Sequence, residues 1–327
     1  MRAIRLHAFG PAENLVHEQV EDPVPGPGQV RIAVAAAGVH LLDTALREGM
    51  EGHPASPASL PAIPGREVAG VVDALGEGTD ESWLGKRVVA HIGMGPGGYA
   101  ELAVTEAARL HEIPGTLGEA EAIAMIGTGR TALGILQFTE LGPGDIAIIP
   151  AAAGGIGTLL VQYAKNVGAV AIGLAGGTAK VDRVRANGAD LAVDYRIPGW
   201  DQEVRDFLGG RKADVVFDAV GGETGLAAVD LLGKGGLHLV FGWFADGPLS
   251  FTEAELAERG ITSESVLGPA MIEKAGGDVR NLETRSLAEA AAGRLRPAVQ
   301  RFPLADAAGA HRAMETRATM GKVVLIP

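Results

Sequence analysis

Cysteine is absent from the sequence. Its absence excludes disulfide bonds, a thiolate nucleophile and any zinc site that depends on cysteine ligands. Basic residues are also in deficit, because 28 Lys and Arg stand against 40 Asp and Glu and give a formal net charge of -12. Nucleic acids and anionic membranes recruit basic patches, so we expect neither of them as a partner. An anionic ligand must therefore be held by a local site.

Long apolar segments are missing as well. The longest apolar tract, residues 146–161, is interrupted by Pro150 and three glycines, so it lacks the length of a membrane span. Residues 1–12 mix charged with apolar side chains and contain no signal-peptide core. With 327 residues, of which 47% are hydrophobic, the composition predicts a globular cytoplasmic protein large enough for two domains.

The first 118 residues consist of short segments of β character separated by glycine and proline, a spacing typical of a compact all-β or barrel-like unit. Four prolines within residues 51–64 indicate a loop there, which is a candidate lid over a site. The predicted strands of this region are residues 2–7, 29–37, 67–75, 87–91, 99–104 and 109–113.

The pattern changes at Glu119. Residues 119–138 have apolar side chains at helical spacing and predict a long helix that joins the two halves. Apolar strands then alternate with helices, which indicates a parallel, doubly wound sheet that binds its ligand at the carboxyl ends of the strands. The predicted strands are residues 146–149, 170–174, 191–194, 213–218, 237–241, 261–267 and 321–327, and the predicted helices are residues 179–187, 200–208, 223–232, 282–293 and 305–315, with one more directly after the first strand.

A phosphate-binding turn is predicted between the first of these strands and its helix. Ala152, Gly154 and Gly157 occupy the three positions of the G-x-G-x-x-G fingerprint, with alanine in the first. Small residues let the backbone approach a pyrophosphate, and the free N–H groups at the start of the next helix face the anion. An ordinary tight turn is the alternative, but the flanking strand and helix are those that the fingerprint requires. We therefore predict a dinucleotide site.

The position that selects between NAD and NADP follows about 20 residues after the glycines, at residues 174–178. An Asp or Glu there binds the ribose hydroxyls of NAD, but this segment contains no acid. Thr178, Lys180 and Arg183 instead offer a hydroxyl and two cations, as a 2′-phosphate requires. As an alternative, the two cations belong to the solvated face of the next helix. The pattern favours NADPH.

A family resemblance rests on short stretches whose order and spacing together are specific. They are AAGVHLLD at 36–43, IPGRE at 63–67, GGYAE at 97–101, TA at 131–132, AAAGGIG at 151–157, NGAD at 187–190, DYR at 194–196, DAVG at 218–221 and GKVVL at 321–325. By these stretches the chain resembles, over essentially its whole length, the zinc-free quinone oxidoreductases (zeta-crystallin-like) of the medium-chain dehydrogenase/reductase superfamily.

The resemblance implies an α/β protein with a GroES-like, β-rich catalytic domain and a Rossmann coenzyme domain that has a doubly wound parallel sheet. The catalytic domain would comprise residues 1–119 and 271–327, the NADPH-binding domain would comprise residues 120–270, and the substrate would bind in the cleft. The resemblance also implies a homodimer with a continuous sheet. Such a dimer would pair the edge of the predicted strand 261–267, which a monomer leaves open.

The resemblance further implies which residues hold NADPH. Residues 153–156 would cradle the pyrophosphate, Gly176, Lys180 and Tyr195 would line the adenosine end, and residues 241–244 would approach the nicotinamide. The alternatives are a half-buried strand position for Tyr195 and a place in the core for the aromatic residues of the last segment. The candidate cofactor-binding residues are Thr131, Ala152, Ala153, Gly154, Gly155, Ile156, Gly157, Gly176, Thr178, Lys180, Tyr195, Phe241, Gly242, Trp243 and Phe244.

His40 and Asp43, in the first matching stretch, are the candidate catalytic residues. Many quinone reductases of this branch have Asn and two Tyr in the substrate cleft where this chain has His40, Ala45 and Glu51, which indicates a pocket that is more polar at one edge. His40 is suited to donate a hydrogen bond or a proton to the substrate oxygen, because histidine titrates near neutrality. Asp43 is suited to orient the substrate or the ribose. The alternatives are a turn histidine and a helix cap.

No metal site is predicted. Zinc-using relatives bind the ion through Cys, His and Glu or Asp, and His40 and Glu67 fall where such ligands or their neighbours lie. Two N/O groups without a thiolate make a poor zinc site. The predicted function is therefore zinc-independent, NADPH-dependent hydride transfer to a small molecule, either a quinone or a related conjugated carbonyl compound. The alternatives are an alkene, enoyl or carbonyl reductase on the same scaffold and a non-catalytic NADPH-binding regulator or structural protein.

Overall fold

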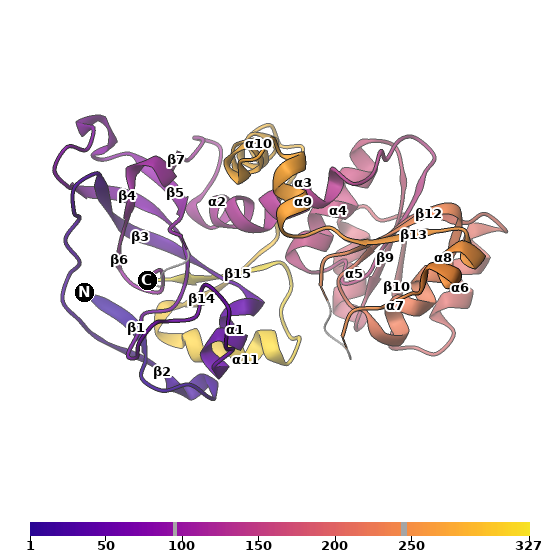
Figure 1. The fold of residues 1–327 in the computed structure, drawn as a ribbon, viewed down its shortest axis with the longest axis horizontal. Helices are drawn as coiled ribbons and strands as arrows, with labels where there is room; N and C mark the ends of the chain where they lie inside the picture. Colours follow the sequence, from indigo (N-terminus) through magenta and orange to yellow (C-terminus); the bar gives the residue numbers. More distant parts are fainter. Residues whose placement is uncertain (94–96, 243–246) are drawn as a thin grey trace. The chain divides into compact units, whose positions relative to one another are not determined.

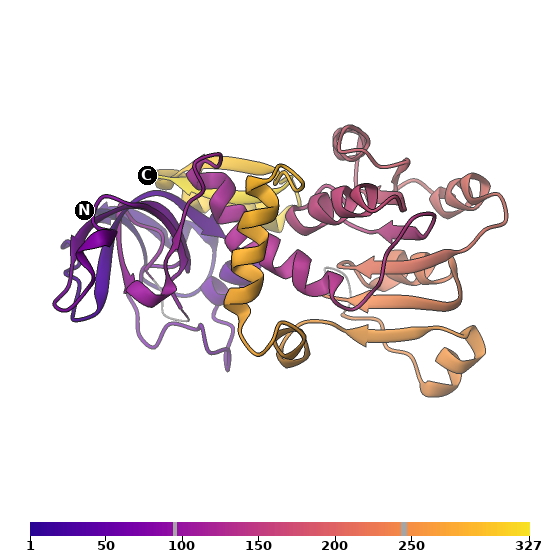
Figure 2. The ribbon, with the colours of Figure 1, turned by 90° about the horizontal axis from the view of Figure 1, so that it is seen from above.

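The computed structural model describes residues 1–93, 97–242 and 247–327. The chain divides into two compact units (Figures 1 and 2). Unit 1 comprises Met1–Thr128 and Pro297–Pro327, and unit 2 comprises Gly129–Arg296. The N-terminal and C-terminal segments thus share a unit, as the sequence predicts, although residues 120–128 belong to unit 1 rather than to the coenzyme unit.

The second difference from the predicted domain boundaries concerns residues 271–296, which belong to unit 2. They include α10 (Val279–Ala291), which lies against α3 (Arg130–Leu136; Figure 2). Across this contact Arg130 Nη1 lies 3.0 Å from Glu283 Oε1, and Glu283 is only 7% exposed. This buried ion pair is a physical reason for α10 to pack with unit 2.

A mainly antiparallel sheet forms the framework of unit 1, in the strand order β14-β15-β3-β4-β5-β7, with β6 also paired to β3. Residues of β3 alternate between the core and the outer face, and Val30, Ile32 and Val34 are buried. The strands are β1 (Arg2–Leu6), β2 (Leu15–Gln19), β3 (Gln29–Val39), β4 (Glu67–Leu75), β5 (Arg87–His91), β6 (Leu102–Glu106), β7 (His111–Glu112), β14 (Val299–Pro303) and β15 (Lys322–Ile326), of which β1 and β2 form a separate antiparallel pair.

The C-terminal segment completes the sheet of unit 1. β15 runs antiparallel to β3 with Val323 opposite Val39, and β14 runs parallel to β15. Because β15 begins at Lys322, this register places Lys322 beside the residue that follows β3, which is His40. The C-terminal segment thus supplies two strands to the sheet of unit 1.

The predicted long helix at residues 119–138 is divided into α2 (Glu119–Ala124), a π-helical turn (Met125–Gly129) and α3. Within this turn a Cβ atom on Gly127 would lie 1.9 Å from Glu67 Oε1. The backbone therefore comes very close to a side chain of β4, at a glycine. The other helices of unit 1 are α1 (Leu41–Glu48) and α11 (Ala307–Glu315), with 3-10 turns at Ala12–Asn14, Glu81–Trp83, Ala107–Arg109 and Leu304–Asp306.

Unit 2 is a parallel sheet in the strand order β10-β9-β8-β11-β12-β13. Strand order reverses between β8 and β11, which is the position where open α/β sheets bind ligands. The strands are β8 (Ile146–Ile149), β9 (Val170–Ala175), β10 (Leu191–Asp194), β11 (Ala213–Asp218), β12 (Leu232–Val240) and β13 (Thr262–Ser265), and the remaining helices are α4 (Gly155–Asn166), α5 (Thr178–Ala186), α6 (Trp200–Leu208), α7 (Gly222–Val229), α8 (Glu253–Arg259) and α9 (Pro269–Lys274).

The predicted fold class, a GroES-like unit with a Rossmann-type parallel sheet, is confirmed. Some elements were not predicted, namely β2, β14, α8 and α9. The boundary between α7 and β12 differs from the predicted one, because the helix ends at Val229 and the buried Leu232 begins the strand. No helix in the described part of the chain is both long and apolar enough to cross a membrane.

Candidate functional site

The turn between β8 and α4 brings backbone atoms unusually close together. Ala151 has a positive φ of 52°, and the N–H of Ala152 donates to Leu174 O of β9 at 3.0 Å. A Cβ atom on Gly157 would lie 2.5 Å from Ala151 O and 2.6 Å from Ala152 Cα, so only glycine lets α4 pack this closely on the turn. The first N–H groups of α4 have no partner within the helix and are suited to bind a pyrophosphate.

The residues predicted to bind the adenosine end gather at the same edge of the sheet. Gly176 follows β9 and Tyr195 follows β10, and a Cβ atom on Gly176 would lie 3.1 Å from Tyr195 Oη. Thr178 and Lys180 lie in the first turn of α5. Because parallel strands end at one edge of a sheet, these four residues lie at the edge that also carries the β8–α4 turn.

The sequence analysis missed an acid at this edge. Asp194, the last residue of β10, forms a two-pronged ion pair with Arg196, at 3.1 Å to Nε and 3.0 Å to Nη2. The hydrogen bond from Arg196, aided by the N–H of Gly177, lowers the pKa of Asp194 to about 2. Arg196 Nη2 would be 2.5 Å from a Cβ atom on Gly177. The stretch DYR at 194–196 includes this acid, but the sequence analysis considered only residues 174–178, which follow the glycine turn by about 20 residues.

The structure gives fewer contacts for the remaining candidate cofactor-binding residues. Thr131 lies in α3. Phe241 is 9% exposed and its N–H donates to Asp218 O at 2.9 Å, so much of its side chain belongs to the core. A Cβ atom on Gly242 would lie 3.3 Å from Ala219 O. Trp243 and Phe244 lie outside the described residues. A role of these five residues in cofactor binding stays a prediction.

A buried series of hydrogen bonds holds the loop that follows β11. This loop lies beside the position where the strand order of the sheet reverses. Asp218 Oδ1 accepts hydrogen bonds from the N–H groups of Val220 and Gly221 at 2.8 and 2.9 Å. Its Oδ2 lies 3.1 Å from His238 Nε2, and His238 Nδ1 lies 2.8 Å from Ser263 Oγ. Burial raises the pKa of Asp218, but hydrogen bonds from His238 and the loop outweigh this effect and lower it. The ionised carboxylate therefore fixes the loop.

In unit 1, three side chains from different elements meet around one carboxylate. Glu67 begins β4, Lys322 begins β15 and His40 directly precedes α1. Glu67 Oε1 lies 2.6 Å from His40 Nε2, and Glu67 Oε2 lies 2.9 Å from Lys322 Nζ. Lys322 Nζ and His40 Nε2 are also 2.9 Å apart. We call these three residues the imidazole–carboxylate–ammonium cluster.

Two of the three side chains in the cluster are shielded from solvent. The side chains of Glu67 and Lys322 are 0% and 4% exposed, whereas that of His40 is 27% exposed. A Cβ atom on Gly38 would lie 2.4 Å from Glu67 Oε2, and Gly127 approaches the other oxygen in the same way. Burial would raise the pKa of Glu67, but the charges of His40 and Lys322 outweigh burial and hold that pKa well below its usual value. Glu67 is therefore ionised, and His40 is the member that solvent reaches.

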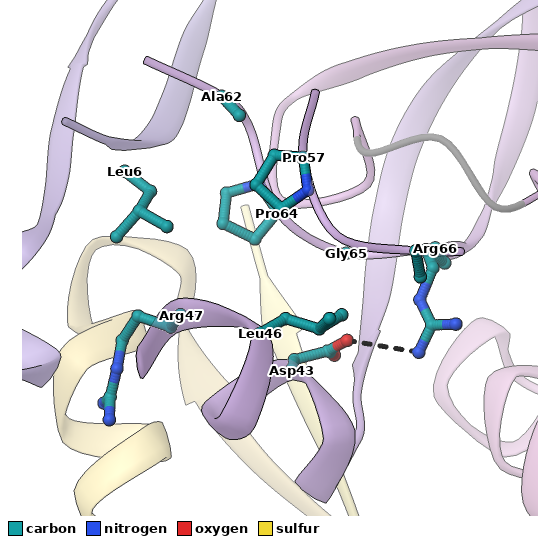
Figure 3. A pocket seen from close by; sticks show the side chains of 10 residues that line it. Leu6, Asp43, Leu46, Arg47, Pro57, Ala62, Pro64, Gly65 and Arg66 are labelled. Atoms are coloured by element: carbon teal, nitrogen blue, oxygen red, sulfur yellow. Dashed lines mark hydrogen bonds and ion pairs between the residues drawn. The ribbon is translucent and has the colours of Figure 1, made fainter. Parts of the chain in front are cut away.

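Asp43 lies beside the cluster as a buried cap. Its Oδ2 accepts the backbone N–H of His40 at 2.9 Å and the Tyr99 hydroxyl at 2.9 Å. Its Oδ1 lies 3.3 Å from Arg66 Nη2 (Figure 3). Asp43 is only 4% exposed. This geometry supports the helix-cap alternative for Asp43, and Asp43 would act on a ligand through the position of His40.

Tyr99 links Asp43 to a second buried histidine. The Tyr99 hydroxyl lies 3.3 Å from His311 Nε2, and the two rings meet edge to face. Burial lowers the pKa of His311 to about 4, so this imidazole is neutral near pH 7. The same network therefore joins Asp43 to an uncharged histidine.

The predicted lid borders a small cavity of about 30 Å³ beside α1 (Figure 3). Ala55 and Pro57 line it from the proline-rich segment, opposite Leu46 of α1. Figure 3 shows the guanidinium of Arg47 directed away from this space, so the cavity is mainly apolar. Ala45 is half-buried and Glu51 is exposed. A polar edge formed by Glu51 stays a prediction.

The cluster does not fit a zinc ion. Lys322 Nζ lies within 2.9 Å of both His40 Nε2 and Glu67 Oε2, so a cation already lies between the two groups that could bind a metal. A zinc ligand set also needs further nitrogen, oxygen or sulfur donors. Among the residues that the structure describes, no group of three or more His, Cys, Asp and Glu side chains could hold a metal ion.

Comparison with known proteins agrees with both units. Residues 26–115 match the alcohol dehydrogenase GroES-like domain, and residues 155–281 match the zinc-binding dehydrogenase domain. Together these matches define a two-domain dehydrogenase. A 2-haloacrylate reductase from a Burkholderia species is 33% identical over 98% of both chains. A quinone oxidoreductase of Salmonella typhimurium is 33% identical over 99% of both chains.

Solved structures give the same result. A quinone oxidoreductase of Pseudomonas syringae is 31% identical with a TM-score of 0.84, over 100% of this chain and 99% of that chain. The Escherichia coli quinone oxidoreductase, solved with NADPH, is 27% identical with a TM-score of 0.84 over the full length of both chains. The chain belongs to the medium-chain dehydrogenase/reductase superfamily, in its quinone oxidoreductase branch, and it is an oxidoreductase. The predicted family is thereby confirmed.

Proposed function

We propose that the chain is an NADPH-dependent reductase of quinones and related conjugated carbonyl compounds. The observation that carries this proposal is the edge of the parallel sheet in unit 2. There the close β8–α4 turn, the hydroxyl of Thr178 and the cations Lys180 and Arg196 lie near one another, and the acid Asp194 is neutralised by Arg196. Such an edge suits a pyrophosphate and a 2′-phosphate. The NADPH-bound quinone oxidoreductase of Escherichia coli supports the same cofactor.

The chemistry divides between the cofactor and the chain. NADPH, when bound, supplies a hydride to an electron-poor centre of the substrate. Negative charge then develops on the substrate oxygen, and a donor that stabilises this charge lowers the barrier. We assign this role to His40, because it is the solvent-accessible member of the imidazole–carboxylate–ammonium cluster. The role of Asp43 is to hold His40 through its backbone N–H.

The test is NADPH consumption by the purified chain with a panel of quinones and enones. Turnover with NADPH, and weaker turnover with NADH, is the expected result. Tight NADPH binding without turnover on any member of the panel would instead favour the non-catalytic binding protein. No binding of either cofactor would contradict the proposal altogether.

Alkene reduction is a second candidate, favoured by the 2-haloacrylate reductase that is 33% identical to this chain. The presence of His40 supports it too, since reduction of a conjugated alkene generates a basic enolate-type oxygen that benefits from a proton donor. A 2-haloacrylate included in the panel distinguishes the candidates. Faster turnover with this substrate than with quinones would make alkene reduction the main activity.

We also propose a homodimer that joins through β13. β13 pairs with β12 on one side and ends the strand order of the sheet. An open edge is a place for a second copy to pair, and pairing across a two-fold axis would extend the sheet. The deficit of basic residues supports a cytoplasmic protein without nucleic-acid partners.

A further inference from the structure

We propose that His238 and Ser263 are positioning residues for the nicotinamide half of NADPH, and that they act through Asp218 on the loop at residues 219–221. These three side chains form the buried series of hydrogen bonds in unit 2, and we call them the loop anchor. The inference rests on the proposed function for the choice of NADPH as cofactor, and it extends that function to residues without a predicted role. It follows from the contacts of the three side chains and from the place of the loop in the parallel sheet.

The register of the sheet brings the three side chains together. Asp218 is the last residue of β11, His238 lies in β12 and Ser263 lies in β13. His238 is directly opposite Ser263 on one side and directly opposite Val216 on the other. Paired residues of neighbouring strands, and residues two apart in one strand, share a face of the sheet. Asp218 therefore projects from the same face as His238 and Ser263, on three adjacent strands.

The hydrogen bonds of the loop anchor have one consistent direction. Asp218 Oδ1 accepts the N–H groups of Val220 and Gly221 at 2.8 and 2.9 Å, and an ionised carboxylate can only accept. His238 Nε2, 3.1 Å from Asp218 Oδ2, must therefore carry a proton and donate it. The other ring nitrogen, Nδ1, lies 2.8 Å from Ser263 Oγ. Ser263 thus fixes the ring in the orientation that points Nε2 at the carboxylate.

Burial prevents solvent from replacing a contact within the loop anchor. The side chains of Asp218 and His238 are both 0% exposed. A Cβ atom on Gly225 would lie 2.7 Å from Asp218 Oδ2, so the backbone of α7 closes over the carboxylate. The ring of Phe251 meets that of His238 edge to face, with the centroids 5.9 Å apart. Removal of the imidazole donor would therefore leave the carboxylate short of a hydrogen bond, and the loop would have to move to compensate.

Asp218 holds two segments of backbone at the edge of the sheet. Its side chain fixes the loop up to Gly221, which has a φ of 67° and directly precedes α7. Its backbone O accepts the N–H of Phe241 at 2.9 Å, directly after β12. A Cβ atom on Gly242 would lie 3.3 Å from Ala219 O, so the half-buried Gly242 packs on the loop. The loop anchor therefore sets both the loop and the start of the segment that follows β12.

The order of the strands places this surface at one half of the cofactor. β11 runs parallel to β8, with Val216 opposite Ile148, so the loop lies beside the β8–α4 turn that suits the pyrophosphate. The candidate residues for the adenosine end follow β9 and β10, on the other side of β8. A dinucleotide that crosses the switch point therefore lays its nicotinamide half over the carboxyl ends of β11 and β12. We expect the loop anchor to act on that half alone.

The first test uses NMR on the full chain without cofactor. In a ¹⁵N spectrum of the histidine side chains, with His238 assigned by comparison to His238→Gln, we expect a proton on Nε2 that exchanges slowly with water. The backbone N–H groups of Val220 and Gly221 should exchange faster in Ser263→Ala than in the wild type. A bare Nε2, or unchanged exchange of both N–H groups, would overturn the proposal. This test needs neither substrate nor turnover.

The second test compares two ligands by titration. NADPH contains both halves of the cofactor, whereas adenosine 2′,5′-bisphosphate contains the adenosine and the 2′-phosphate but no nicotinamide. His238→Leu should weaken NADPH binding about tenfold, the effect of one lost hydrogen bond, and leave the affinity for the bisphosphate nearly unchanged. Ser265→Ala, which removes an exposed hydroxyl from the same strand as Ser263, is the matched control and should change neither affinity. Equal losses for the two ligands in His238→Leu would overturn the proposal.

Milder variants cover the case in which His238→Leu does not fold. His238→Gln keeps an N–H donor near the position of Nε2 and should retain most of the NADPH affinity. Ser263→Ala should weaken NADPH binding about threefold in the wild type and not at all in the His238→Gln background, because Ser263 acts only through the imidazole. Wild-type affinity in folded Ser263→Ala would overturn the proposal. A wild type that binds NADPH but reduces no substrate would instead contradict the proposed function, and the binding test would still decide the role of the loop anchor.

Discussion

At the scale of single residues, the partly exposed side chain of His40 carries the main catalytic prediction. If the imidazole stabilises charge on the substrate oxygen, its contribution appears in the transition state and only weakly in cofactor binding. We predict that His40→Ala lowers kcat on an enone about a hundredfold and leaves NADPH affinity nearly unchanged. Quinones should lose less, because they accept electrons readily. Steady-state kinetics on one quinone and one enone check this, and wild-type rates on both would make His40 structural.

The choice between NADPH and NADH is a second prediction at the scale of single residues. Lys180 lies in the first turn of α5, which directly follows Gly177, and Gly177 lies against Arg196 of the Asp194–Arg196 ion pair. We predict that NADPH binds at least about tenfold more tightly than NADH, which is about 1.4 kcal/mol, and that Lys180→Ala removes most of this preference. Arg185→Ala, an exposed cation in the last turn of the same helix, is the matched control. Titrations of both cofactors measure the effect, and equal affinities in the wild type would contradict it.

His311 gives the stability of unit 1 a defined pH dependence. Its pKa is about 4 in the folded chain against an ordinary value of 6.5, so only the unfolded chain takes up this proton between those values. The free energy of unfolding must therefore fall as pH decreases from 6.5 to 4. We predict that His311→Gln reduces the stability difference between pH 7 and pH 5 by about 2 kcal/mol. Urea unfolding at the two pH values measures it.

The control for that measurement is His17→Gln, because His17 is exposed on β2. Its pH dependence should match that of the wild type. An unchanged pH dependence in His311→Gln would mean that the buried imidazole takes up its proton in the folded chain as readily as in the unfolded chain.

At the scale of elements, the start of α4 depends on one glycine. A Cβ atom on Gly157 would meet backbone atoms of Ala151 and Ala152, which cannot move aside as a side chain would. We predict that Gly157→Ala lowers stability by about 1–3 kcal/mol and weakens NADPH binding, because α4 must shift away from the turn. Gly115→Ala is the control, since nothing lies within 4 Å of its added Cβ. Thermal unfolding and cofactor titration measure both effects, and unchanged binding in Gly157→Ala would contradict the assignment of this turn.

Elements were predictable where local sequence determines them. The strands β4, β5, β8, β10 and β11 and the helix α6 have the predicted bounds, because each is a short apolar or amphipathic segment between clear breakers. The break of the helix at residues 119–138 was not predictable, since it arises where Gly127 meets Glu67, a contact between distant parts of the sequence. Edge strands such as β14 lack a strong apolar pattern and were missed for that reason.

The residues of the candidate site, too, were predictable only where the local sequence determines them. The glycine turn was visible because its residues are adjacent in sequence and its chemistry is backbone chemistry. Asp194 escaped notice because it reaches the nucleotide edge from β10 and not from β9. Glu67 was noticed only as a possible metal ligand, and the meaning of Lys322 depends on its distance to His40, which no local pattern encodes.

At the scale of the whole molecule, β13 predicts assembly. Its residues Thr262–Ser265 pair with β12 on one side, and a second copy would pair the other edge. We predict a dimeric mass by light scattering at micromolar protein. Ser263→Pro would remove a backbone donor from β13, but it would also disturb the hydrogen bond to His238. Val266 N–H donates to Val240 O of β12, so the N–H of Ser265 faces the open edge. Ser265→Pro is therefore the cleaner variant and should shift the protein toward the monomer. A monomeric wild type would contradict the dimer.

The placement of β15 also dictates an order of events during synthesis. Lys322 lies 282 residues after His40, and its strand fills the place between β3 and β14. Unit 2 is one continuous stretch, so it can fold on the ribosome while unit 1 still waits for its last strand. His40 would thus be the last part of the candidate site to acquire its surroundings. A chain clipped before Lys322 would keep a nucleotide-binding unit, lose the buried ammonium and leave the edge of β3 open to other chains.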